Sequence, residues 1–221
     1  MTFDLSILFI DDHLLVVNKP AGLPTLPDGY DKSAPCLINL VKQQYRRVWV
    51  VHRLDKDTSG AIVFARSAEI HRALNIAFDS HEVSKVYHAI TIGVPAWDEH
   101  MIDLPLRPDG DRRHRTAVDR QRGKPAVTRV RVIERFAQHA LIEARPETGR
   151  THQIRAHLAA IDLPLAGDVL YGGKDAVVLL AHTALHAQSI ELDHPATHQR
   201  LHVEAPYPLD LTELLDRLRG Q

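Results

Sequence analysis

The sequence predicts a mixed α+β fold, in which helices flank a largely antiparallel sheet. Short apolar runs with strand character outnumber the stretches with helical spacing, and the two kinds do not alternate in the strand–helix–strand order of a parallel sheet. The 221 residues include 44% hydrophobic and 25% charged ones, which is typical of a globular chain. Neither an internal repeat nor a convincing linker interrupts the sequence, so we expect a single domain over residues 1–221.

The first expected elements are strands. Apolar runs at 7–10 and 14–18 flank three polar residues at 11–13, which predicts a hairpin. The segment 19–22, Lys-Pro-Ala-Gly, ends this pattern because proline and glycine both interrupt regular structure.

The next stretch predicts two helices and three strands. Apolar residues at helical spacing predict helices over 37–45 and 68–78. Between them, VWVV (48–51) and AIVFA (61–65) are short apolar runs typical of strands. Apolar and polar residues alternate at 83–94, which predicts another strand after the second helix.

In the second half, apolar residues alternate with arginines at 127–133, which predicts a half-buried strand with a basic outer face. Residues 140–144 continue the sheet. A turn at 148–151 leads into a helix over 152–160, and we expect Thr151 to be its N-cap.

The C-terminal part predicts strands near 185–192 and near 200–204, then an amphipathic helix over 209–218. With these elements the strands outnumber the helices along the whole chain. This count favours α+β over an alternating α/β architecture.

Several classes of protein are disfavoured by the composition. There is no run of about 18 apolar residues, so we expect no membrane-spanning helix. The N-terminus lacks the basic and apolar regions of a signal peptide. Cys36 is the only cysteine and cannot form an internal disulfide, which fits the reducing cytoplasm. We therefore expect a cytoplasmic protein, and a monomer by default.

The charge is unevenly distributed. The segment Arg107 to Arg131 holds nine Lys or Arg and three acids, a net +6, although the whole chain carries −1. Such a stripe indicates a polyanion bound on one face, but a solvated charged loop gives the same pattern. Arg112, Arg113 and Arg115 are the candidates for contacts with this polyanion.

A metal site is not expected, although the chain has 15 histidines. His182 and His186 are four residues apart, but they fall in an expected strand, and no His-Glu-x-x-His pattern occurs. The segment 172–174, Gly-Gly-Lys, lacks the first glycine of a phosphate-binding loop. We expect neither a metal nor a cofactor.

The most informative segment is the nonapeptide HRLDKDTSG at 52–60, which holds Asp55 between two expected strands. Flanking strands can hold such a loop rigidly, which suits a positioned carboxylate. An aspartate near an arginine is, however, also typical of a surface ion pair.

This nonapeptide resembles the catalytic motif of the RluA family of RNA pseudouridine synthases. Five further segments resemble other parts of the same family, and all follow in the expected order between roughly residues 7 and 208. They are DDHLLVVNKPAG (11–22), VSKVYHAI (83–90), TGRTHQIRAHLAAIDLPLAGDVLYGG (148–173), LLAHTALHA (179–187) and HVEAPYP (202–208). The resemblance implies a pseudouridine synthase catalytic domain.

The resemblance also implies roles for individual residues. Asp55 corresponds to the nucleophile, and Arg155 to the arginine that keeps it ionised and oriented. Tyr87 corresponds to the tyrosine that lies against the uracil ring. Arg53 corresponds to the residue that probes the gap left by the flipped uridine, and Ile154 would form an apolar wall of the base pocket.

The implied reaction breaks the N-glycosidic bond of uridine, rotates the base and rejoins it to the sugar through carbon, without a cofactor. It leaves open whether the covalent adduct forms at the sugar or on the base. Because the first motif begins near residue 7, we expect no S4 RNA-binding module. Compact members of this kind act on structured RNA, namely 23S rRNA and a tRNA anticodon stem-loop. The basic stripe would then supply phosphate contacts, with no obligate protein partner.

Other functions fit the same residues. The chain could be a catalytically silent RNA-binding or folding factor, which would bind RNA without releasing tritium from C5 of uridine. It could be an N-glycoside hydrolase, which would release free uracil. It could also be a synthase specific for a single rRNA or tRNA site.

Overall fold

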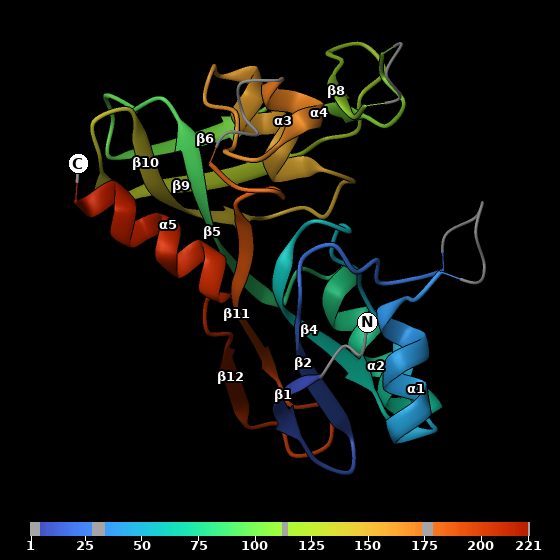
Figure 1. The fold of residues 1–221 in the computed structure, drawn as a ribbon. Helices are drawn as coiled ribbons and strands as arrows, with labels where there is room; N and C mark the ends of the chain where they lie inside the picture. Colours follow the sequence, from blue (N-terminus) through green and yellow to red (C-terminus); the bar gives the residue numbers. More distant parts are fainter. Residues whose placement is uncertain (1–4, 28–33, 112–114, 174–178, 221) are drawn as a thin grey trace. The chain divides into compact units, whose positions relative to one another are not determined.

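The computed structural model describes four stretches of the chain, residues 5–27, 34–111, 115–173 and 179–220 (Figure 1). The fold divides into two compact units, one made of residues 1–85 and 187–207 and the other of 86–186 and 208–221. The chain crosses between the units inside strands β5 (Ser84–Ile92) and β11 (Leu185–Asp193), and again after residue 207.

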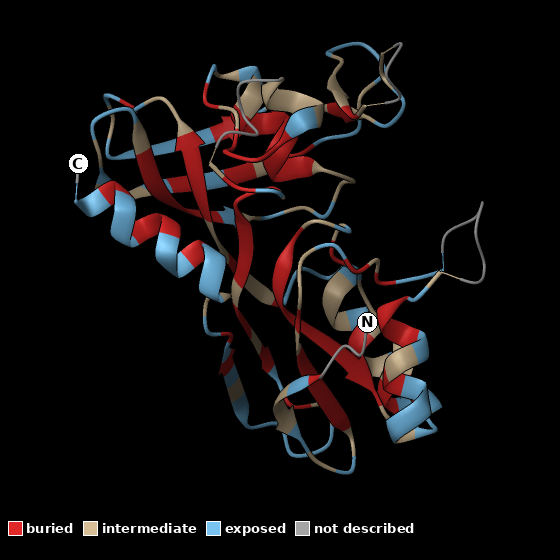
Figure 2. Cartoon of the chain, in the orientation of Figure 1, coloured by how far each residue is buried: buried red, intermediate tan, exposed pale blue. Residues whose placement is uncertain are grey.

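The first unit is built on strands hydrogen-bonded in the order β1-β2-β4-β11, with β12 beside β11 and β3 beside β4. Their bounds are β1 Ser6–Ile10, β2 Leu14–Lys19, β3 Trp49–Val50, β4 Ser59–Ala65 and β12 Arg200–Glu204. Strands β1 and β2 form the predicted antiparallel hairpin, with Ser6 opposite Asn18. Every residue of β4 is buried (Figure 2), as its uninterrupted small and apolar sequence requires of a strand covered on both faces.

The described residues of the first unit also form two amphipathic helices, and both were predicted. Helix α1 (Leu37–Tyr45) buries Leu37, Ile38 and Val41. Helix α2 (Ala68–Asp79) begins at the N-cap Ser67, whose side chain accepts a hydrogen bond from Ile70 N at 3.2 Å. Ile70 and Leu74 of α2 join the core that β2, β4 and β11 form.

The second unit has strands in the order β5-β10-β9-β6 and a separate two-stranded ribbon, β7-β8. The bounds are β6 Glu99–Asp103, β7 Leu106–Arg107, β8 Ala117–Val118, β9 Val127–Arg135 and β10 His139–Pro146. In β10, Ala144 lies opposite both Tyr87 of β5 and Val130 of β9, and these pairings are antiparallel. The predicted α+β class with a largely antiparallel sheet is confirmed.

In the part of the second unit that the structure describes, the helices are α3 (Gln153–Ala160), α4 (Val169–Gly172) and α5 (Leu209–Arg219). Helix α3 places Ile154 and Leu158 in the core of this unit. Helix α5 buries four leucines along one face, whereas its other face is exposed (Figure 2). Arg219 near its end pairs with Glu134 of β9 at 2.9 Å.

The predicted N-cap of α3 is wrong. The cap is His152, in a left-handed conformation with φ 52°, and its side chain makes no capping hydrogen bond. The buried Gln153 side chain closes this turn instead, since its Oε1 accepts from Arg150 N at 3.0 Å and from Thr148 Oγ1 at 2.7 Å. A long-range bond from Gln153 Nε2 to Val127 O, at 2.9 Å, then fixes the start of the helix to β9.

Within the described stretches, none of the helices combines the length and hydropathy needed to cross a bilayer. Cys36 lies immediately before α1 and is fully buried.

Candidate active site

The segment between β3 and β4 in the first unit carries Asp55, and its backbone is held on both sides of that residue. Asp55 is half-buried, whereas Arg53 is exposed. The buried Thr25 hydroxyl donates to Leu54 O at 2.8 Å and accepts from Leu54 N at 3.2 Å. Thr58 N donates to Asp55 O at 3.2 Å, which closes a turn after the aspartate.

Lys19 anchors the other side of Asp55. Its ammonium group is fully buried at the end of β2 and donates to Lys56 O at 3.0 Å. It also donates to Pro20 O at 2.9 Å and to Leu23 O at 2.7 Å. These three bonds use all three N–H groups of a protonated lysine, and a neutral amine has only two. The segment 19–25 therefore serves as the support of the Asp55 loop.

The environment of Lys19 shifts its titration into the neutral range. Burial lowers the pKa of Lys19 from 10.5 to about 7, and the negative charges of Asp57 and Asp55 oppose this shift. The two carboxylates and the lysine therefore form a coupled set of charges around the loop.

Replacing Lys19 with methionine should remove a pH dependence of stability. Because the pKa is lower in the folded protein, the unfolded chain binds more protons between about pH 7 and the usual lysine range. Burial of Lys19 therefore adds stability as pH rises through this window, by at most about 1.4 kcal/mol per pH unit. Urea unfolding of both proteins from about pH 7 to 9 measures this. The free energy of unfolding of wild type should rise with pH relative to that of Lys19→Met, and a difference between the two that does not change with pH would contradict the prediction.

The two ends of the nonapeptide have structural roles. Val63 N donates to His52 Nε2 at 3.1 Å, and the His52 ring stacks on Phe78 with centroids 4.7 Å apart. Burial, together with the charge of Lys85, lowers the pKa of His52 to about 3, so the ring is a neutral acceptor. At the other end Gly60 has φ 112°, and a Cβ there would lie 2.2 Å from Ala187 O. Only glycine fits this position.

In the second unit, Tyr87 and Ile154 belong to one hydrophobic cluster. Tyr87 lies on β5 opposite Ala144 and is half-buried. It packs against a cluster that contains Ile154, whose exposed fraction is 6%. The structure thus brings together two of the residues predicted to contact the base.

Arg155, next to Ile154 on α3, is held by Asp168. Its Nε lies 2.7 Å from Oδ2 and its Nη2 lies 2.8 Å from Oδ1, a two-pronged pairing between side chains that are 8% and 0% exposed. Asp168 is also the N-cap of α4, where Oδ1 accepts from Leu170 N and Tyr171 N at 3.2 Å each. The position of the guanidinium is therefore tied to the start of a helix.

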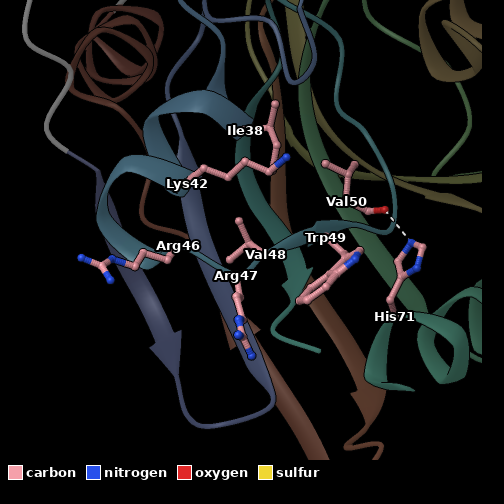
Figure 3. Close-up of a pocket in the computed structure, with 8 residues that line it drawn as sticks. All are labelled: Ile38, Lys42, Arg46, Arg47, Val48, Trp49, Val50 and His71. Atoms are coloured by element: carbon pink, nitrogen blue, oxygen red, sulfur yellow. Dashed lines mark hydrogen bonds between the residues drawn. The ribbon is translucent and has the colours of Figure 1, made fainter. Parts of the chain in front are cut away.

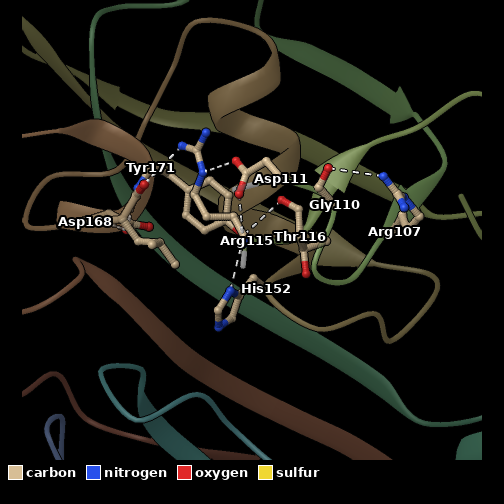
Figure 4. Close-up of polar contacts among 9 residues, drawn as sticks. Arg107, Gly110, Asp111, Arg115, Thr116, His152, Asp168 and Tyr171 are labelled. Atoms are coloured by element: carbon tan, nitrogen blue, oxygen red, sulfur yellow. Dashed lines mark hydrogen bonds and ion pairs between the residues drawn. The ribbon is translucent and has the colours of Figure 1, made fainter. Parts of the chain in front are cut away.

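Tyr171 supports Arg155 from a second direction. The Arg155 guanidinium carbon lies 5.1 Å from the centre of this ring, and that of Arg115 lies 5.5 Å from it. The Tyr171 hydroxyl donates to Thr116 O at 3.1 Å and lies 3.2 Å from Nδ1 of His152 (Figure 4). Burial raises the pKa of Tyr171 to about 12 despite the charge of Arg155, so the phenol is neutral.

Of the predicted polyanion contacts, Arg112 and Arg113 lie outside the described residues. Arg115 Nε donates to Asp111 Oδ2 at 2.6 Å, and its Nη1 donates to Leu170 O at 3.1 Å (Figure 4). Further stripe arginines are also ion-paired, namely Arg107 and Arg122 with Asp119, Arg129 with Glu147 and Arg131 with Glu143. Among the described residues, five of the nine stripe cations therefore pair with carboxylates, two of them with glutamates outside the stripe. The binding role of the stripe stays a prediction.

Four supporting residues were not singled out from the sequence: Lys19, Thr25, Asp168 and Tyr171. A lysine at the end of a strand that begins with four buried apolar residues was a usable signal for Lys19, because such a lysine needs partners when it is buried. Asp168 stands directly before a short helix, as an N-cap does. No group of three or more potential metal ligands gathers anywhere in the described stretches.

Comparison with known proteins shows the family to which the chain belongs. Residues 13–160 match the family described as RNA pseudouridylate synthase. The ribosomal large subunit pseudouridine synthase D of Pseudomonas aeruginosa is 40% identical, over 98% of this chain and 72% of its own length. The dual-specificity RNA pseudouridine synthase RluA of Vibrio vulnificus is 36% identical, over 95% of this chain and 87% of its own length. The chain belongs to the RNA pseudouridylate synthase family and is a pseudouridine synthase.

Solved structures show the same fold. Human RNA Pseudouridylate Synthase Domain Containing 4 superimposes with a TM-score of 0.80 at 28% identity, covering 97% of this chain and 93% of that one. Human RNA Pseudouridylate Synthase Domain Containing 1 gives a TM-score of 0.77 at 24% identity, covering 99% and 96%.

Proposed function

We propose that this chain isomerises specific uridines of structured RNA to pseudouridine, with Asp55 as the nucleophile. One observation carries the assignment: the backbone on both sides of Asp55 is fastened by buried side chains, Thr25 and Lys19. A carboxylate presented in this way on a fixed loop suits covalent catalysis, which needs a positioned nucleophile.

The reaction needs no external reactant. The bond between N1 of uracil and C1′ of ribose breaks while Asp55 holds a covalent adduct, either at C1′ or on the base. The base rotates, a bond forms between C5 and C1′, the adduct with Asp55 breaks, and the C5 proton leaves while N1 gains one. Tyr87 lies against the base, and its hydroxyl assists removal of the C5 proton. Ile154 forms the apolar wall, and Arg53 fills the gap left by the flipped nucleotide.

Arg155 keeps Asp55 ionised and oriented in this proposal. The role is assigned by resemblance, and the two-pronged pairing with Asp168 together with the Tyr171 ring supports it. A guanidinium fixed at these contacts presents a planar set of donors in a defined direction, which a flexible lysine would not do.

The proposed substrates are 23S rRNA, a tRNA anticodon stem-loop, or both. Relatives named for the large ribosomal subunit and for dual specificity support this pair. A cytoplasmic location is part of the same proposal, because these RNAs are found there. We propose that residues 1–221 act as one catalytic domain, as a monomer without an obligate protein partner.

Two measurements test the proposal. Pseudouridine mapping in total rRNA and tRNA, from cells with and without the gene, should show the loss of defined sites. Purified protein should release tritium from C5 of uridine in the RNA that carries those sites. Free uracil among the products would indicate a hydrolase instead, and RNA binding without tritium release would indicate a silent binding factor.

A further inference from the structure

A cavity of about 460 Å³ lies in the first unit, and none of the residues that line it is assigned to chemistry (Figure 3). It is formed by α1, the turn after α1, β3 and α2. The residues that give it chemical character are Lys42, Arg46, Arg47, Trp49 and His71.

The charge of this cavity is positive and uncompensated. None of its lining residues is acidic. Between Asp31 and Asp55 the sequence has no Asp or Glu but five cations, Lys32, Lys42, Arg46, Arg47 and Arg53. Among the described residues no carboxylate pairs with any of the three cations that line the cavity. They differ in this respect from the paired arginines of the basic stripe.

Arg46 stands at a position where a side chain is disfavoured. It follows the last residue of α1 with φ 35° and ψ −56°, a positive-φ conformation that residues with a side chain rarely adopt. A charged side chain kept on such a backbone points to a need for its charge, because glycine would relieve the strain.

Two rings line the cavity beside these cations. Trp49 is half-buried on β3, and the ring of His71 is fixed by its contact with Val50 O at 3.1 Å (Figure 3). Cations that follow a backbone, together with aromatic rings, are the usual composition of sites for single-stranded nucleic acid.

We infer that this cavity binds the phosphodiester backbone of the substrate RNA strand, a few nucleotides from the target uridine. The inference rests on the proposed function, because it assumes that the bound polyanion is the RNA presented to Asp55. Val50 lines the cavity and precedes Asp55 by five residues, so a fully extended chain separates the two by at most about 18 Å. A strand of a few nucleotides can span that distance.

The test is a triple substitution, Lys42→Ala, Arg46→Ala and Arg47→Ala, measured with an rRNA or tRNA fragment that wild type binds. Affinity should fall by about tenfold or more at roughly 0.15 M salt, and the slope of log affinity against log salt should fall by about 2. The control removes Arg72 and Arg217, exposed cations outside the cavity with which no carboxylate pairs among the described residues.

Each outcome decides the inference. An unchanged affinity and slope in the triple variant, as expected if the cavity takes an acidic protein segment, would overturn it. An equal loss in the control would overturn it too, because general charge would then explain the effect. Affinity and slope are measured without turnover, so a wild type that binds RNA but releases no tritium defeats the proposed function alone.

A single substitution separates charge from backbone strain. Arg46→Gly should raise the melting temperature, because glycine accepts the positive φ, and should weaken RNA binding by a few-fold. RNA affinity equal to that of wild type would count against a role of this side chain in the cavity.

Discussion

Asp55→Asn should abolish isomerisation, with turnover reduced by roughly four or more orders of magnitude. The amide has nearly the same shape as the carboxylate, but it is a poor nucleophile and carries no negative charge. The hydrogen bonds that hold the loop use the backbone of Leu54, Lys56 and Asp55, so the substitution leaves them in place. RNA affinity should therefore stay within a few-fold of wild type.

The matched control is Asp57→Asn. Asp57 lies in the same loop, is half-buried, and also acts electrostatically on Lys19. Its loss should change turnover by no more than about tenfold, because the charge around Lys19 changes while the nucleophile remains. Tritium release under single-turnover conditions measures both variants. Substantial residual turnover in Asp55→Asn, or an equal loss in Asp57→Asn, would defeat the assignment.

Asp168→Asn should cause the largest loss of stability among the substitutions considered. The asparagine can still cap α4 through its carbonyl oxygen, but it removes the negative charge that faces Arg155. Both side chains of this pair are almost fully buried, and breaking a buried ion pair costs about 3–5 kcal/mol. Turnover at saturating RNA should fall as well, because Arg155 loses its fixed orientation.

Asp111→Asn serves as the control for this prediction. It breaks the pair with Arg115, whose side chains are 30% and 27% exposed, and such pairs contribute at most about 1 kcal/mol. Urea unfolding of the two variants and wild type gives the comparison. Similar stabilities for Asp168→Asn and Asp111→Asn would show that the buried pair does not fix Arg155.

The sequence alone determined the longer strands and helices and indicated Asp55 as the candidate nucleophile, whereas β6, β7, β8 and α4 were not predicted. Helix α1 has the predicted bounds, and the hairpin β1-β2 lies where two apolar runs flank a polar turn. These features are local, because the periods of strands and helices are set by neighbouring residues. The nonapeptide around Asp55 could also be recognised as a motif from the sequence, because its residues are consecutive in the chain.

Only the tertiary structure decided what supports Asp55 and Arg155. Thr25 bonds to Leu54 across 29 residues, and Lys19 bonds to Lys56 across 37 residues. Contacts between residues so far apart in the chain produce no periodic pattern in the sequence. Thr151 failed as a cap for the same reason, because Gln153 takes its partner from β9. Folding also neutralised arginines of the basic stripe with distant glutamates, while three cations around Trp49 kept their charge uncompensated among the described residues. Charge along a sequence is a sum over residues, whereas binding depends on which charges folding leaves unpaired.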